Sequence, residues 1–238
     1  MSKKQKKLVA LSAALAISFG IIPTANAMHI MEGYLPPIFC VVWGVVCLPF
    51  LAAGFFSIKN TLKTNRRSIT ILAMAGAFIF VISSLKIPSV TGSCSHMTGT
   101  GLGALLFGPS AVSILGIIVL LFQAILLAHG GLTTLGANCF SMAIAGPFVS
   151  FGIYKLCLKL KVNKLAAVFL AASIGDLFTY CVTSVQLAMA HPSEAGGIGA
   201  SMAKFLAVFA PTQVPLAILE GILTVLIIIG LETYAKKE

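Results

Sequence analysis

The chain has 238 residues, of which 58% are hydrophobic and only 9% charged, whereas about a quarter of the residues in an ordinary globular protein are charged. This composition excludes an ordinary soluble enzyme and predicts an all-α polytopic membrane protein, because lipid must solvate most of such a surface. A net charge of +10 would suggest a nucleic-acid partner if the chain were soluble. Here, however, the basic residues lie at the start of the chain and in short gaps between apolar stretches. Membrane lipid and not nucleic acid is therefore the expected partner.

Residues 1–27 have the three-part layout of a secretory signal peptide. Four lysines lie within the first seven positions, an apolar stretch follows, and Pro23 precedes small residues at the two positions that a signal peptidase reads, Ala25 and Ala27. We predict cleavage after Ala27, with an uncleaved signal anchor as the alternative. The mature chain, residues 28–238, then forms one transmembrane domain whose free amine is delivered to the outer side of the membrane.

Apolar stretches of spanning length follow along the mature chain at 38–58, 68–85, 136–158, 165–190 and 211–234. A further apolar stretch, 101–128, is broken at Gly108-Pro109, where a helix would kink or turn. This break favours a short helix followed by a full one. With both counted, we expect about seven transmembrane helices.

The basic residues between these stretches predict the orientation. If the mature N-terminus is outside, the first span ends inside at one basic cluster, and the cluster after 136–158 should be cytoplasmic too. An odd number of crossings must connect them, so 101–128 supplies either none or two. The C-terminus is then cytoplasmic, and two basic residues, Lys86 and Lys204, remain outside. The ten on the cytoplasmic side are Lys59, Lys63, Arg66, Arg67, Lys155, Lys159, Lys161, Lys164, Lys236 and Lys237.

Motifs of several enzyme classes are missing from the sequence. It contains no G-x-x-x-x-G-K-[ST] loop, so we do not expect this chain to hydrolyse ATP itself, and it contains neither H-E-x-x-H nor G-x-S-x-G. Two acids, Asp176 and Glu220, fall within apolar spans. For each of them a functional role and a structural hydrogen bond to a neighbouring helix remain open interpretations.

His29 is the most informative histidine because it becomes the second residue of the mature chain. Its Nδ1, its own backbone nitrogen and the Met28 amine can close adjacent chelate rings around one ion. A fourth nitrogen from another histidine would complete a planar set, which suits Cu(II) or Ni(II) and is accessible to Co(II). Because binding displaces protons from the amine and the amide, affinity should rise with pH through about 7.7 to 8.0.

His96 is the best candidate for that fourth donor. It lies in an external stretch rich in Gly, Ser and Thr, where glycines permit close backbone approach and hydroxyls can bond the second imidazole nitrogen. His129 opens a similar stretch that ends at Asn138. His129 and Asn138 are weaker candidates than His96, and we expect them among the residues that support the metal ligands. His191 is interpreted as an ordinary residue of an external loop.

Three of these stretches together resemble the CbiM family, the substrate-capture component of energy-coupling factor cobalt transporters, whose nickel relative is NikM. They are MHIMEGYLP at 28–36, GSCSHMTGTGLG at 92–103 and HGGLTTLGAN at 129–138. The resemblance covers essentially the whole mature chain and implies an S-component bundle. It also implies that the N-terminal segment inserts into the helices, and that metal is held by the Met28 amine, the amide and imidazole of His29, and His96.

The resemblance further implies partners, substrate and location. The partners would be a small CbiN-type membrane protein, a CbiQ-type transmembrane coupling protein and a CbiO-type ATPase in the cell membrane, supplying cobalt for cobalamin synthesis. Met31-Glu32 is more similar to the cobalt members than to the nickel ones, so Co(II) is the expected substrate, with Ni(II) as the alternative. A metal-dependent intramembrane enzyme is a rival hypothesis, although Glu32 is the only acid close to the proposed ligands. A passive channel is another.

Overall fold

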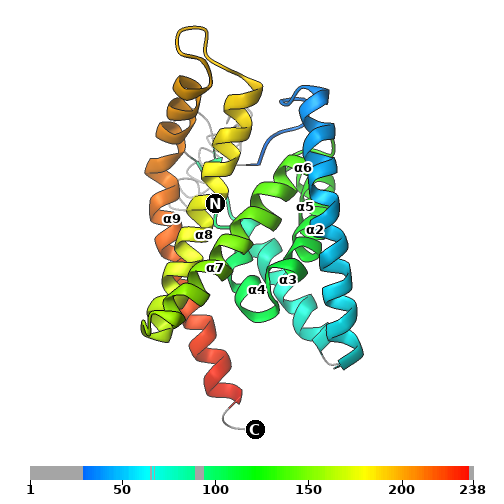
Figure 1. The fold of residues 1–238 in the computed structure, drawn as a ribbon, viewed down its shortest axis with the longest axis vertical. Coiled ribbons are helices and arrows are strands. Elements are labelled where there is room, and N and C mark those ends of the chain that lie inside the picture. The colour runs from blue at the N-terminus through cyan, green and yellow to red at the C-terminus, as the bar shows by residue number, and fades with distance from the viewer. Residues whose placement is uncertain (1–28, 65, 67, 89–93, 236–238) are drawn as a thin grey trace, which may run out of the picture.

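The structure is a computed structural model that describes residues 29–235 apart from positions 65, 67 and 89–93. The described residues form seven helical segments, joined by short connections, with one pair of two-residue antiparallel strands (Figure 1). The segments are α2 (Pro37–Thr64), α3 (Ser68–Ser84), α4 (Thr100–Phe107), α5 (Pro109–Leu127), a composite of α6 (Leu135–Asn138), η2 (Cys139–Ala145) and α7 (Gly146–Lys159), then α8 (Lys164–Ala190) and α9 (Gly197–Ala235), while β1 (Ile87–Pro88) pairs with β2 (Cys94–Ser95).

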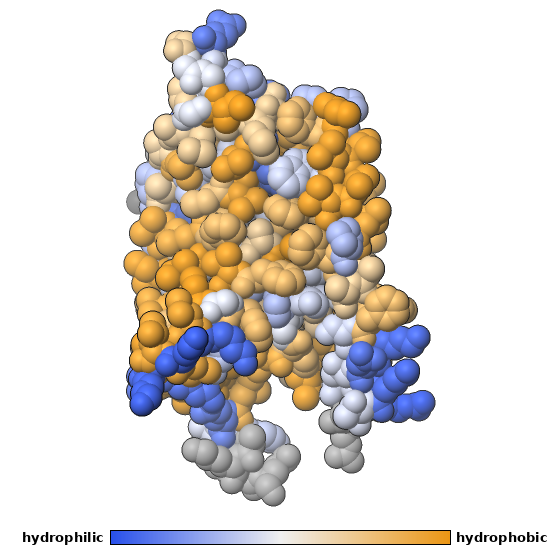
Figure 2. Space-filling model, viewed as in Figure 1, coloured by the Kyte–Doolittle hydropathy of each residue, from blue (hydrophilic) through white to orange (hydrophobic). Residues whose placement is uncertain are grey.

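The all-α multi-pass fold predicted from composition is therefore confirmed. Five of the segments are long and apolar enough to cross a membrane, namely α2, α5, the composite of α6 to α7, α8 and α9. Helix α3 is shorter and also apolar. Their outer faces carry large apolar side chains, such as Val41 and Leu48 of α2, which are 62% and 60% exposed. Apolar residues cover most of the surface between the two ends in Figure 2, as a lipid-facing protein requires. The predicted leader, residues 1–27, lies outside the described residues.

The predicted break at Gly108-Pro109 is confirmed. Helix α4 ends at Phe107 after eight residues, and α5 begins at Pro109 and runs for 19. Gly108 has a φ of 83°, which a residue with a side chain rarely adopts, and proline at the first helical position has no amide hydrogen to leave unpaired. Local chemistry alone therefore separates these two helices.

Helix α9 differs from the expectation, because it begins at Gly197 and not near 211. Pro211 and Pro215 lie inside it, although each proline removes one helical hydrogen bond. Packing against α8 compensates for this loss. The Tyr180 hydroxyl of α8 donates to backbone carbonyls of α9, and its ring lies 5.6 Å from that of Phe209. Tertiary contacts thus extend α9 by more than three turns beyond its most apolar part.

The stretch predicted at 136–158 is also less regular than expected, because its first half contains the seven-residue π-helix η2. This segment packs very closely on α5. A Cβ atom added at Gly116 of α5 would lie only 2.3 Å from the Cβ of Ala143. The buried core at this contact includes Val112, Val119 and Met142. The core thus lies between α5 and η2.

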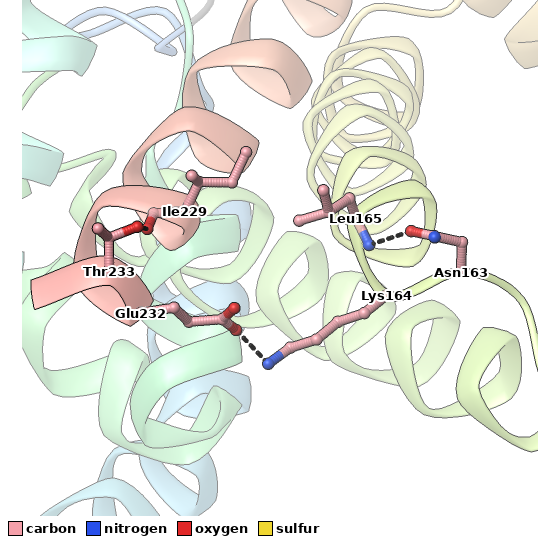
Figure 3. A network of polar contacts seen from close by, with 6 residues as sticks. All are labelled: Asn163, Lys164, Leu165, Ile229, Glu232 and Thr233. Carbon is pink, nitrogen blue, oxygen red and sulfur yellow. Dashed lines mark hydrogen bonds and ion pairs between the residues drawn. The ribbon is translucent and has the colours of Figure 1, made fainter. Parts of the chain in front are cut away.

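Basic residues gather at one end of the molecule. The α2–α3 connection, the α7–α8 connection and the end of α9 all lie toward this end, with the first two on opposite sides of the view, and the α8–α9 connection lies at the other end (Figure 1). Figure 3 shows an ion pair at this end, in which Lys164 at the start of α8 bonds Glu232 of α9. The side chain of Asn163 caps α8 by accepting a hydrogen bond from the Leu165 amide at 2.8 Å. The clustering of charge at one end agrees with the pattern from which topology was predicted.

Candidate metal centre

Three histidines from distant parts of the sequence meet inside the bundle. His29 lies in the segment before α2, His96 between β2 and α4, and His129 directly after α5. Their side chains are almost completely buried, with 3%, 0% and 1% of their surface exposed. Three uncharged nitrogen donors are thereby collected in one place without contact to bulk water.

The nitrogens that face one another are specific atoms of each ring. His29 Nδ1 lies 2.8 Å from His96 Nε2 and 3.1 Å from His129 Nε2. The rings of His29 and His96 are stacked, with centroids 4.6 Å apart and planes inclined by 14°, whereas His129 meets His29 edge-on at 4.4 Å. One ligand atom from each of the three residues lies within 4.8 Å of the other two. Such a group of imidazole nitrogens can bind a single transition-metal ion.

A backbone contact fixes the orientation of His96. Its Nδ1 lies 2.9 Å from the carbonyl oxygen of Met97, and because a carbonyl only accepts, this nitrogen must carry the proton. The lone pair of the neutral ring is then on Nε2, the atom that faces His29. The sequence had suggested a hydroxyl for this role, but the backbone of the next residue fills it.

Burial keeps these imidazoles neutral. It lowers the pKa of His96 to about 4 and that of His129 to about 2, and it lowers the pKa of His29 well below its usual value, to which the neighbouring His129 and His96 contribute further. In each case the charged ring would lose its hydration. A neutral imidazole is the form that binds metal, so the lowered pKa values favour ligation.

The segment that carries His29 is held in place by the chain after α5. Asn138 accepts a hydrogen bond from the Ile30 amide at 2.7 Å and donates to the Ile30 carbonyl at 3.0 Å. The Thr134 hydroxyl donates to the same carbonyl at 2.6 Å. Gly131 is required by this contact, because a Cβ atom there would lie 2.6 Å from the Cα of Glu32. The segment therefore lies in a slot whose walls are made by residues 130 to 138.

Glu32, the acid nearest to the histidines in the sequence, is engaged elsewhere. Its carboxylate accepts hydrogen bonds from the Thr133 amide, at 3.1 Å, and from the Thr133 hydroxyl. These bonds lower the pKa of Glu32. Both carboxylate oxygens are thus used to attach the N-terminal segment to the same slot, and this does not favour the role of a general base.

The loop that carries His96 is anchored to the last two helices. Gln213 of α9 donates to the His96 carbonyl at 3.2 Å and to the Asp176 carboxylate of α8 at 2.6 Å. Glu220 accepts from the Thr98 amide at 2.6 Å, from the Thr98 hydroxyl at 2.9 Å and from the Gly99 amide at 3.0 Å. The two intramembrane acids left open from the sequence therefore make structural hydrogen bonds, and these bonds run to the histidine loop.

Of the residues singled out in the sequence, Met28 lies outside the described residues. His29 and His96 are brought together, Asn138 bonds the residue next to His29, and His129 lies almost as close to His29 as His96 does. His191 is separate, since its Nε2 bonds the Tyr34 carbonyl at 2.8 Å. Sequence reasoning missed Thr134, Gln213 and the Met97 carbonyl, none of which has a local signal.

Comparison with known proteins gives a consistent result. Residues 29–237 match the family described as the cobalt uptake substrate-specific transmembrane region, CbiM. The chain is 78% identical over 238 residues to the cobalt transport protein CbiM of Lachnoclostridium phytofermentans, an alignment that covers 100% of this chain and 95% of that protein. It is 64% identical over 224 residues to the CbiM protein of Chlorobium limicola, covering 94% and 88% of the two chains.

Solved structures give a similar picture. A crystal structure of a transition metal transporter superposes with a TM-score of 0.75 at 30% identity and covers 87% of this chain and 94% of that one. A crystal structure of a truncated transition metal transporter gives the same TM-score at 28% identity. The relatives are thus named for transport and not for catalysis.

Proposed function

The chain belongs to the CbiM family of cobalt transport proteins, and from this premise we propose that it captures Co(II) at the outer face of the cell membrane as the substrate-binding subunit of an ATP-driven importer. The mature N-terminus lies outside and the C-terminus in the cytoplasm in this proposal. The observation that carries it is the meeting of His29 Nδ1 with the Nε2 atoms of His96 and His129.

The proposed ligands are the Met28 amine, the His29 amide nitrogen and Nδ1, and His96 Nε2. A chelate of the first three uses Nδ1 and not Nε2 of His29, and Nδ1 is the nitrogen that faces the other histidines. Donors about 2.0 Å from a metal and at right angles to one another lie about 2.8 Å apart. The distance of 2.8 Å between His29 Nδ1 and His96 Nε2 suits adjacent positions in such a plane.

His129 is proposed to support this plane from one side. Its Nε2 lies 3.1 Å from His29 Nδ1, a distance that also suits a neighbouring position around the same ion, as an axial donor. An added axial nitrogen favours Co(II), whereas a square plane without one suits Ni(II) at least as well. Cobalt is therefore the proposed substrate, with nickel as the alternative.

Release is proposed to follow from withdrawal of the N-terminal segment. Three of the four proposed donors belong to this segment: the Met28 amine and the amide nitrogen and Nδ1 of His29. The segment is attached to its slot through hydrogen bonds of Asn138, Thr134 and Thr133. Movement of α8 and α9 would also shift His96, because Gln213 and Glu220 bond its loop. Loss of either part of the ligand set breaks the chelate and lowers the affinity.

The energy for this movement must come from other chains. We propose a CbiQ-type coupling protein and a CbiO-type ATPase, with a small CbiN-type membrane protein, in agreement with the missing ATP-binding loop. The imported cobalt would supply cobalamin synthesis. Uptake in intact cells should then stop when ATP is depleted, and uptake that continues unchanged would favour a passive channel.

The ligand set can be tested by cobalt analysis of the purified, processed chain after dialysis. We expect about one Co(II) per chain for the unaltered protein, and a Kd at least 100-fold higher for His29→Ala and for His96→Ala, because each removes one imidazole nitrogen from the proposed ligand set. His191→Ala is the matched control, since this histidine bonds the Tyr34 carbonyl away from the cluster. Tight binding by His96→Ala would remove His96 from the site.

A further inference from the structure

A groove at the α2–α3 end of the molecule combines an apolar wall with three cations. It has a volume of about 1010 Å³ and is lined by α2, the start of α3 and Ile114 of α5. The lining residues of α2 and its connection follow one helical face, at positions 55, 58, 59, 62, 63 and 66. Figure 2 shows hydrophilic groups gathered at this end below the apolar surface.

The geometry of the groove follows from how three helices pack. Helix α2 approaches α5 closely at Gly54, where an added Cβ atom would lie 2.3 Å from the Ser110 carbonyl oxygen. The groove begins at the next residue, Phe55. Phe55 and Ile69 stand 58% and 59% exposed on its two sides, so it opens sideways onto the lipid-facing surface.

The cations of the groove have no acid beside them in the described part of the chain. Lys59 and Lys63 are one helical turn apart, about 6 Å along the axis, and Arg66 follows. Like charges at this spacing repel. The acids that the structure describes lie elsewhere: Glu32 and Glu194 near the opposite end, Asp176 of α8 and Glu220 of α9 in the contacts that anchor the His96 loop, and Glu232 with Lys164.

We propose that this groove binds one anionic phospholipid. Its phosphate would lie among Lys59, Lys63 and Arg66, and its acyl chains along Phe55, Ile58 and Leu62, whose side chains continue the same helical face into the membrane. Charge complementarity favours this occupant, because three close cations need an anion, and the apolar continuation needs hydrocarbon. An acidic segment of a partner protein would pair with the cations, but it would not supply the hydrocarbon that the lipid-facing apolar wall requires.

The test uses the full processed chain in vesicles. Trp43 is the single tryptophan of the sequence, so the variant Trp43→Phe with Phe55→Trp reports from the groove alone. Phospholipids with brominated acyl chains quench this fluorescence on contact. We expect brominated phosphatidylglycerol to be at least tenfold more effective per molecule than brominated phosphatidylcholine, since each basic residue favours an anionic headgroup about fivefold.

Two charge variants then distinguish lipid binding in this groove from a general attraction of anionic lipids to basic residues. On the reporter background, Lys59→Gln with Lys63→Gln and Arg66→Gln should bring this ratio close to one. The matched control, Lys155→Gln with Lys159→Gln and Lys161→Gln, removes the same charge from the other basic cluster and should change the ratio less than twofold. An equal fall in both triple variants would overturn the proposal, as would equal quenching by the two lipids in the unaltered groove.

Two further outcomes concern the occupant. Glycerol 3-phosphate, which lacks acyl chains, should not relieve the quenching; full relief would assign the site to a free phosphate and contradict the proposal. Protection of the reporter tryptophan by a purified coupling protein, with no preference between lipids, would assign the groove to a protein interface instead. If the Phe55 reporter does not elute as a single species, Ile69→Trp reports from the opposite wall of the groove.

Discussion

Replacing Asn138 by alanine should weaken cobalt binding although Asn138 is not one of the proposed ligands. Its side-chain amide bonds both the backbone amide and the backbone carbonyl of Ile30, at 2.7 and 3.0 Å, and makes a third contact to Thr134 Oγ1 at 3.3 Å. Ile30 follows His29 directly. Asn138 therefore holds the N-terminal segment in the position where His29 Nδ1 meets His96 and His129.

The size of the effect can be worked out from these contacts. After the substitution, the Ile30 carbonyl still accepts from the Thr134 hydroxyl at 2.6 Å, but the buried Ile30 amide loses its partner. An unsatisfied buried donor costs about 1–3 kcal/mol, and each lost hydrogen bond contributes about 1 kcal/mol. If docking of the segment loses 2–3 kcal/mol, the Kd for Co(II) rises about 30- to 150-fold.

A competition titration with a chromogenic chelator would measure this Kd. Asn163→Ala is the matched control, because Asn163 also accepts a hydrogen bond from a backbone amide, that of Leu165 (Figure 3), but does so at the start of α8. It should cost about 1 kcal/mol of stability and leave the Kd within twofold. Hydrogen exchange of residues 29–36 should speed up only in Asn138→Ala. A Kd for Asn138→Ala within threefold of the unaltered chain would refute the reasoning.

Three further results are expected. Because burial lowers the pKa of His96 to about 4 and lowers that of His29 well below its usual value, neither ring should contribute protons at pH 7; loading at this pH should release about two protons per cobalt, from amine and amide, and calorimetry that finds four or more would contradict this. Glu220→Gln should lower thermal stability by the equivalent of about 2 kcal/mol, since an amide nitrogen cannot accept from the Thr98 loop, and an unchanged melting temperature would count against that anchor. Lys164→Ala should cost at most about 1 kcal/mol, because Lys164 and Glu232 are 54% and 41% exposed, and a larger loss in thermal unfolding would show a stronger pair than this exposure permits.

Features set by local chemistry could be predicted from the sequence. The apolar stretches gave the helical segments, and Gly108-Pro109 separated α4 from α5 because their backbone requirements act within one turn. His29 and His96 could be paired because the chelate needs a further nitrogen and because the flanking motifs resemble a known family. These inferences needed no knowledge of how the helices pack.

Features set by long-range packing could not be predicted. The start of α9 at Gly197 depends on Tyr180 and Phe209, and the anchoring of the His96 loop depends on Gln213 and Glu220, more than a hundred residues away. The closeness of His129 to His29 could not be predicted for a similar reason. His129 lies close to His29 only because α5, which His129 follows, ends beside the slot that holds the N-terminal segment.

The most direct test of the central claim concerns the amine of Met28. X-ray absorption at the cobalt edge, combined with affinity titration, should be carried out on the processed chain and on one with a Gly-Ser extension before Met28. For the processed chain we expect nitrogen donors at about 2.0–2.1 Å, including at least two imidazoles, and for the extended chain a Kd at least 100-fold higher. An extended chain with the same affinity and the same spectrum would contradict capture through the N-terminal amine.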